Sequence, residues 1–202
     1  MELQHVNIKL LAKGPDQLDL APIVPIFHSW IQSQALEGQL LDVADYRHVT
    51  AGPGVVLIGH EGDYSIDNTD SLLGVRYNRK TPLEGTNQDR LSQATRAAIC
   101  ACQLLQKEPA IKGQLQFNRH DIEVSINDRL LTPNRAETSV TLEPEFRAFA
   151  GWLFAGAAYS LSFSNDRRRL FAALLSTSEP IALDALMSNL DSRRVATSRP
   201  QA

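Results

Sequence analysis

A run of side chains that could do acid–base or metal chemistry lies in the first third of the chain. Histidine, carboxylate and tyrosine side chains exchange protons and bind ions near neutral pH. Between residues 42 and 63 they form the densest such group in the sequence. With two arginines they form the expected ligand- or partner-binding set: Asp42, Asp45, Tyr46, Arg47, His48, His60, Glu61 and Arg76.

Four of these residues, Asp45, His48, His60 and Glu61, are also the candidates for catalysis. Two imidazoles and a carboxylate suit zinc or non-haem iron. However, the chain contains neither His-Glu-x-x-His nor the Gly-x-Ser-x-Gly nucleophile motif. The sequence therefore favours a protein without catalysis, metal or cofactor. A hydrolase or metal-assisted enzyme that uses these four residues is the alternative hypothesis.

Two further motifs have structural explanations. Gly52-Pro53-Gly54 precedes an expected strand, whereas a phosphate-binding loop must lead into a helix. It is therefore interpreted as a turn. Cys100 and Cys102 lie two apart on an expected helix, which places them about 200° apart around its axis. They are expected to be reduced, buried thiols of a cytoplasmic protein.

Charge and hydropathy exclude several classes of protein. The 20 basic residues face 23 acidic ones, and a net charge of −3 gives the chain no electrostatic reason to bind nucleic acid. No apolar run exceeds six residues, far below the roughly 18 that span a bilayer, so no membrane segment is expected. Basic groups at residues 76–80 and 167–169 are interpreted as solvated, edge-protecting charge, with binding of an anionic ligand as the alternative.

Hydrophobic periodicity predicts an alternation of strands and helices. Residues 34–54 are expected to be an extended or irregular connection, and residues 63–70 a polar turn. Strands are predicted at 3–11, 55–61 and 74–78, the last two paired as a hairpin, and at 114–117, 121–126, 158–163 and 168–175. Helices are predicted from about Leu20, over 89–107 with Asp89 as its cap, from Thr141 and over 181–190.

Part of the sequence recurs at an offset of 122 residues. Leu20, Pro22, Phe27 and Trp30 correspond to Leu142, Pro144, Phe149 and Trp152. This indicates an α+β fold of two β-α-β-β units related by internal duplication, about 1–80 and 114–176, joined by the central helix 89–107. We expect antiparallel hairpins with the helices packed on one side. Residues 1–190 would form a single domain, and 191–202 a disordered tail.

The two expected units differ in the length of one connection. About twenty residues separate helix from hairpin in the first unit and about five in the second. Extra chain on a repeated scaffold is a common place for specific function. We therefore expect a small cytoplasmic protein, a non-catalytic binding or regulatory module that recognises a partner protein or small ligand through residues 34–63. Its two exposed hairpins would also allow a homodimer.

Overall fold

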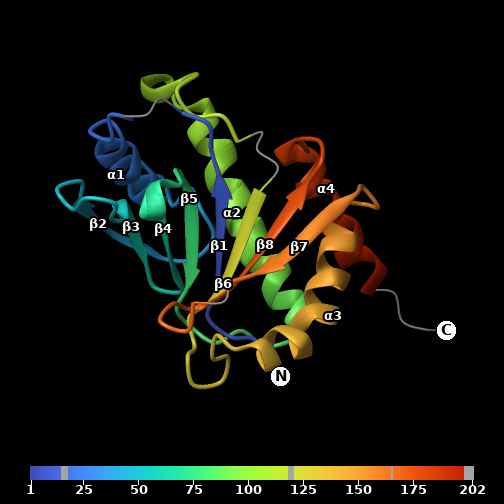
Figure 1. Cartoon of the computed structure of the whole chain (residues 1–202). Coiled ribbons are helices and arrows are strands. Elements are labelled where there is room, and N and C mark those ends of the chain that lie inside the picture. The colour runs from blue at the N-terminus through green and yellow to red at the C-terminus, as the bar shows by residue number, and fades with distance from the viewer. Residues whose placement is uncertain (15–17, 118–120, 165, 198–202) are drawn as a thin grey trace.

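A single antiparallel sheet of eight strands crosses the whole molecule, in the order β2-β3-β4-β5-β1-β6-β8-β7 (Figure 1). The computed structural model describes residues 1–14, 18–117, 121–164 and 166–197. Strand β1 pairs with β6 and so joins the two halves of the chain. The strands are β1 (Val6–Leu11), β2 (Leu40–Tyr46), β3 (Gly54–Gly59), β4 (Gly62–Asp67), β5 (Gly74–Arg79), β6 (Asp121–Ile126), β7 (Tyr159–Phe163) and β8 (Phe171–Thr177).

Four helices cover one face of this sheet. Helix α2 packs on β1 and β5, α1 packs on β2 and β3, α3 contacts β7, and α4 lies against α2 and α3. Figure 1 shows α2 passing behind β1. The helices are α1 (Ile23–Ser33), α2 (Asn87–Lys107), α3 (Ala136–Leu153) and α4 (Leu183–Thr197), with short 3-10 turns η1 (Thr69–Ser71) and η2 (Pro109–Ile111). The predicted α+β class with antiparallel strands is confirmed.

Side chains alternate between the two faces of the sheet because successive residues of a strand point in opposite directions. The face beneath the helices is apolar. Its middle row consists of the buried side chains Leu57, Tyr64, Tyr77, Ile8, Val124 and Ala173. The other face, here called the open face, carries none of the helices of the described residues. Its middle row consists of Val56, Ser65, Arg76, Lys9, Glu123 and Leu174.

Helix α2 forms as its sequence pattern predicts, with one change at its start. Thr86 is the N-cap, and Asp89 is the third residue of a capping box rather than the cap itself. The predicted stripe of apolar residues is fully buried and contains three alanines, which let the helix approach β1 and β5 closely. The stripe consists of Leu91, Ala94, Ala98, Ala101 and Leu105.

Two strands lie where the sequence predicts none. The connection expected to be extended or irregular contains β2, and the expected polar turn at 63–70 contains most of β4. The predicted hairpin of 55–61 with 74–78 is also wrong, because β4 lies between β3 and β5. In β4 the polar residues occupy the open face while Tyr64 and Ile66 face the core. The polar and apolar residues of β4 therefore alternate as in a strand, although its acidic residues make the segment resemble a turn.

Helix ends also differ from the predictions. Pro22 is the N-cap of α1, but α3 begins at Ala136, so Pro144 lies inside that helix instead of in its first turn. Helix α4 continues to Thr197, through much of the predicted tail, and residues 198–202 lie outside the described part of the chain. The two matched tryptophans differ in surroundings, since Trp30 is 3% exposed and Trp152 is 48% exposed.

The two halves of the chain have related connections. From β1 the sheet continues outward through β5 to β4, and from β6 it continues through β8 to β7. In each half a strand is followed by a helix, a hairpin and a second helix. The first half has in addition the β2–β3 hairpin, inserted between α1 and β4 at one edge of the sheet. The surplus chain is thus a regular hairpin.

Candidate functional site

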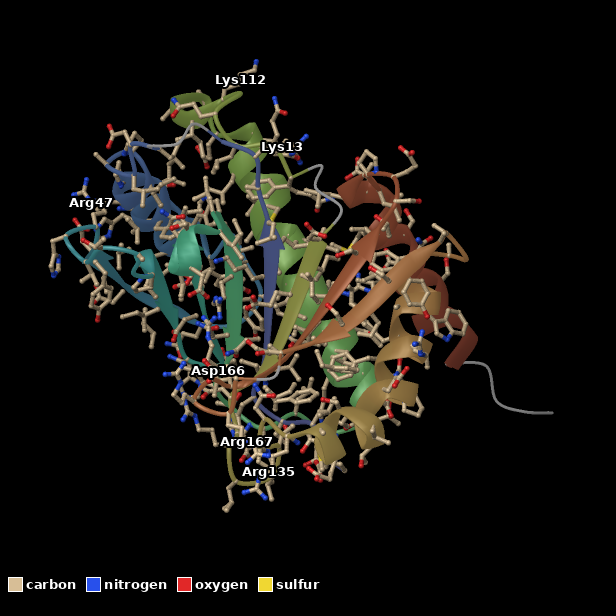
Figure 2. The ribbon with its side chains drawn as sticks, viewed as in Figure 1. Lys13, Arg47, Lys112, Arg135, Asp166 and Arg167 are labelled. Atoms are coloured by element: carbon tan, nitrogen blue, oxygen red, sulfur yellow. The ribbon has the colours of Figure 1, made fainter. Side chains whose placement is uncertain are left out.

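Four of the predicted site residues lie at the tip of the β2–β3 hairpin. The Asp45 carboxylate accepts hydrogen bonds from the Arg47 side chain, from Nη2 at 2.6 Å and from Nε at 2.9 Å. The rings of Tyr46 and His48 lie 6.4 Å apart. All four side chains are exposed, and Figure 2 shows Arg47 at the outer edge of the molecule.

The pairing at the hairpin tip is local. The Arg47 side chain, with help from its backbone N–H, lowers the pKa of Asp45 to about 2. Both partners lie in solvent, where ion pairs are weak because water screens them. Asp42, on the same strand, accepts a hydrogen bond from the backbone N–H of Val43 at 2.8 Å and is exposed. The tip therefore holds a solvated ion pair.

His60 and Glu61 lie at the other end of β3, in the turn to β4. His60 Nδ1 is 3.4 Å from Glu61 Oε1, so these two side chains are adjacent rather than on opposite faces of a strand. The backbone N–H of Gln39 donates to Glu61 and lowers the pKa of that carboxyl. The His60 side chain lies largely in solvent, and the Glu61 side chain is partly exposed.

The four catalytic candidates do not form one site. Tyr46 pairs with Gly54 and Leu40 with Gly59, so His48 and His60 lie beyond opposite ends of β3. Five steps along a strand span roughly 17 Å, too far for two ligands of one metal ion. Within residues 1–14, 18–117, 121–164 and 166–197, no group of three or more histidine, cysteine or carboxylate side chains is placed to hold a metal.

Arg76, the last predicted site residue, lies apart from the others in the centre of the open face. Its Nη2 donates to Glu123 Oε1 at 3.2 Å, and its Nε lies 3.4 Å from Asp67 Oδ2. Lys9, the neighbour of Arg76 on β1, pairs with Asp67 and donates to the carbonyl oxygen of Thr69 at 3.3 Å. Four strands thus bring two cations and two carboxylates together.

The Lys9–Asp67 pair of this central network is buried although it lies on the face without described helices, whereas Arg76 and Glu123 are partly exposed. The side chains of Lys9 and Asp67 are only 2% and 5% exposed. Burial lowers the pKa of Lys9, and the charge of Asp67 opposes that shift. Asp67 also accepts hydrogen bonds from Thr69 N and Oγ1, at 3.1 and 3.0 Å. The ionised pair is therefore satisfied within the fold, as a buried ion pair must be.

The loop between β6 and α3 and the loop between β7 and β8 lie beside this network, and hydrogen bonds join them. Asn134 Nδ2 donates to the carbonyl oxygens of Asp166 and Leu170, at 3.0 and 3.2 Å. Arg129 Nη2 donates to the carbonyl oxygen of Arg168 at 2.8 Å. Figure 2 shows Arg135, Asp166 and Arg167 together at the lower end of the molecule, far from Arg47.

The β7–β8 loop also reaches the segment that follows β4. Arg169 of this loop forms an ion pair with Asp70, which lies 99 residues earlier in the sequence. The contact joins the β7–β8 loop to the connection between β4 and β5. Arg169 is also among the residues that line a cavity on the open face.

That cavity, here called the arginine cavity, has a volume of about 390 Å³. Four arginines and one glutamate are among the residues that line it: Arg76, Arg129, Arg168, Arg169 and Glu123. Three of the arginines have carboxylate partners, in Asp67 and Glu123, in Asp166, and in Asp70. Among the ion pairs of the described residues Arg129 has none. With Lys9, five cations face four carboxylates, which leaves one positive charge.

Sequence reasoning identified only part of this site. It noted Arg76 and the arginines at 167–169 as alternatives for anion binding, but it missed Lys9, Asp67 and Arg129. One signal was available, since Asn7 and Lys9 alternate with the apolar residues of a strand that turns out to be central. Polar residues on the second face of a central antiparallel strand indicate that this face of the sheet is not covered by an apolar layer.

Comparisons with protein-family models, with curated proteins and with solved structures find no match to this chain. Function must therefore be argued from the chemistry of the site. Across the part of the chain that the structure describes, no helix has both the length and the apolar character needed to cross a membrane.

Proposed function

We propose that this protein is a non-catalytic binding module that holds an anionic ligand, a carboxylate or a phosphate, in the arginine cavity. The observation that carries the proposal is the set of four arginines around one 390 Å³ cavity, one of which has no carboxylate partner among the described residues. The planar guanidinium fork matches carboxylate and phosphate oxygens with two parallel hydrogen bonds. A bound anion would balance the remaining positive charge.

The lining also supports binding rather than catalysis. Its hydroxyl groups come from Thr69, Ser125 and Ser164, and its described residues include no histidine. A serine or threonine nucleophile needs a base within hydrogen-bond reach. The volume lies in the range of about 300–1,000 Å³ that is typical of small-ligand sites. A ligand with one or two acidic groups fits both size and charge.

Titration calorimetry with inorganic phosphate and with glutarate tests the proposal. We expect the wild type to bind at least one of these anions, and binding to weaken as salt is added, because salt screens charge. Arg129→Gln should weaken binding about tenfold or more, since a charge-assisted hydrogen bond contributes roughly 1.5–3 kcal/mol. Arg47→Gln is the matched control, because it removes an exposed arginine at the hairpin tip.

Two results would contradict the proposal. One is that neither anion binds the wild type at low salt. The other is that Arg47→Gln weakens binding as much as Arg129→Gln, which would place the anion at the hairpin tip.

A second candidate function is the docking of a partner protein on residues 34–63. It is favoured by three large apolar side chains that the β2–β3 hairpin exposes, Leu41, Tyr46 and Val49. Cross-linking in cell extract would compare the wild type with a Tyr46→Ser, Val49→Ser double variant. Loss of one specific adduct supports docking, and an unchanged set of adducts contradicts it. Light scattering at micromolar concentration would show whether the adduct is a second copy of this chain.

We also infer that the two halves descend from one duplicated unit. The support is the matched order of connections around the β1–β6 pair. The differing exposure of Trp30 and Trp152 argues against a residue-by-residue match at an offset of 122. An alignment of homologous chains tests the idea, because duplication predicts recurring residue patterns that superpose β1 on β6 and β5 on β8.

A further inference from the structure

A second cavity lies on the same open face. It has a volume of about 440 Å³, and three amide side chains line it, those of Asn7, Asn78 and Asn127. Lys80 pairs with Asp63 at 2.7 Å, whereas Arg79 donates to a backbone carbonyl at 2.9 Å and keeps its positive charge. This amide cavity therefore combines neutral hydrogen-bonding groups with a cation, and both suit an acidic ligand.

The strand register places residues that line one cavity directly beside residues that line the other. Asp63, Asn78, Asn7, Ser125 and Ala172 are successive cross-strand neighbours on β4, β5, β1, β6 and β8. The first three line the amide cavity, and the last two line the arginine cavity. Four steps between strands of about 4.8 Å each make this row of residues roughly 19 Å long, and the row with its two cavities is here called the trough.

One buried group in the trough lacks a partner. Asn7 is 5% exposed, and its Oδ1 has no hydrogen-bond partner among the described residues. A buried amide oxygen without a partner is costly, and a site that receives a ligand can carry it until the ligand supplies a donor. Each asparagine side chain offers both a donor and an acceptor, the pair of groups that a peptide backbone presents in reverse.

We propose that this trough binds an extended acidic peptide segment. The peptide's carboxylate occupies the arginine cavity, and its main-chain amides pair with Asn7 and Asn78 in the amide cavity. The proposal rests on the anion-binding function above and adds the class of ligand. At about 3.3 Å per residue, the trough accommodates about six residues of extended chain.

The composition of the trough distinguishes a peptide from a nucleotide. Recognition of a base usually adds an aromatic face on which the base stacks. The described lining residues of both cavities include His5 as the one aromatic ring, and include no phenylalanine, tyrosine or tryptophan. The arginines and amides together match the carboxylates and backbone of an acidic peptide.

Calorimetry with defined peptides tests the proposal on the full chain. The probe is an acetylated and amidated hexapeptide of four alanines followed by two glutamates, with the reversed order as a second probe. A peptide with glutamine in place of glutamate is the control for charge, and glutarate is the control for a free anion. We expect the better acidic peptide to bind at least tenfold more tightly than glutarate, and the glutamine peptide to bind at least tenfold more weakly.

Variants separate the two cavities. Asn78→Ala should weaken peptide binding about three- to tenfold, the value of one hydrogen bond, and leave glutarate binding unchanged. Asn127→Ala is a second variant at a more exposed position and should act in the same direction. Arg129→Gln should weaken the binding of both the acidic peptide and glutarate. Asn189→Ala, on the helical layer, is the matched control and should change neither.

The outcomes distinguish this proposal from the one on which it rests. If glutarate binds but the acidic peptide binds no more tightly, or if neither asparagine variant affects the peptide, the peptide proposal is overturned while the anion site stands. If none of the probes binds the wild type, both proposals fail.

Discussion

The tip of the β2–β3 hairpin and the centre of the open face both pair carboxylates with cations, but in opposite ways. At the tip, Asp45 and Arg47 are two residues apart in sequence and lie in solvent. At the centre, the partners come from β1, β4, β5 and β6, and the Lys9–Asp67 pair is almost fully buried. A dense run of reactive residues can thus remain a local surface feature, while residues scattered along the chain converge.

The difference in burial sets the difference in energy. Charges interact more strongly where water is excluded, but each must then be satisfied by the protein. At the hairpin tip, water solvates both partners, so the ion pair carries little desolvation cost. Buried charges are costly unless each has a partner, so a buried network is better evidence for a functional site than an exposed ion pair.

Removing the buried carboxylate should give the largest effect. Asp67→Ala leaves the Lys9 ammonium buried without its counter-charge, which costs about 3–5 kcal/mol in the free energy of unfolding. The matched variant at the tip is Asp45→Ala, whose urea midpoint we expect to equal that of the wild type within error. Equal shifts of the two midpoints would show that the two regions do not differ as described.

Removing the lysine should cost less than removing the aspartate. In Lys9→Met the Asp67 carboxylate keeps its two hydrogen bonds from Thr69 and the nearby Arg76 guanidinium. Methionine also fills most of the volume of the lysine stem. Urea unfolding should therefore rank Lys9→Met between the wild type and Asp67→Ala. A Lys9→Met protein that is less stable than Asp67→Ala would contradict this asymmetry.

The buried lysine should also make stability depend on alkaline pH. Because burial lowers the pKa of Lys9 below its ordinary 10.5, the unfolded chain binds this proton more tightly than the folded one. The stability of the wild type relative to Lys9→Met should therefore rise as pH increases through the folded pKa up to 10.5. Urea unfolding of both proteins between pH 8 and 10.5 measures it. A relative loss of stability over this interval would show that the Asp67 charge outweighs desolvation.

The smallest expected effect is at the hairpin tip. The Asp45 carboxyl should titrate near pH 2 instead of near 3.8, and Arg47→Gln should return its pKa toward 3.8. Since the folded pKa is the lower one, the stabilisation from this pair is present above pH 3.8 and lost as pH falls through about 2. Carbon-detected NMR titration of the side chain measures the shift. An unshifted Asp45 would mean that the pair does not persist in solution.

How far the sequence predicts the fold depends on what each segment packs against. The stripe of α2 from Leu91 to Leu105 is predictable because local spacing of three and four residues places its five apolar residues on one side. Strands β2 and β4 are not, because their acidic residues resemble a turn until their neighbours in the sheet are known. Similarly, the arginines at 167–169 were visible as a charged group, but nothing local shows that Arg169 meets Asp70.

The sequence by itself determined the α+β class, the course of α2 and most of the strands, because these follow from the periodicity of apolar residues. Only the tertiary structure decided which polar residues form a site. Lys9, Asp67, Arg76 and Glu123 are distributed over 115 residues of chain, and the antiparallel register aligns them on one face. Register is a property of paired strands, so no single segment contains it.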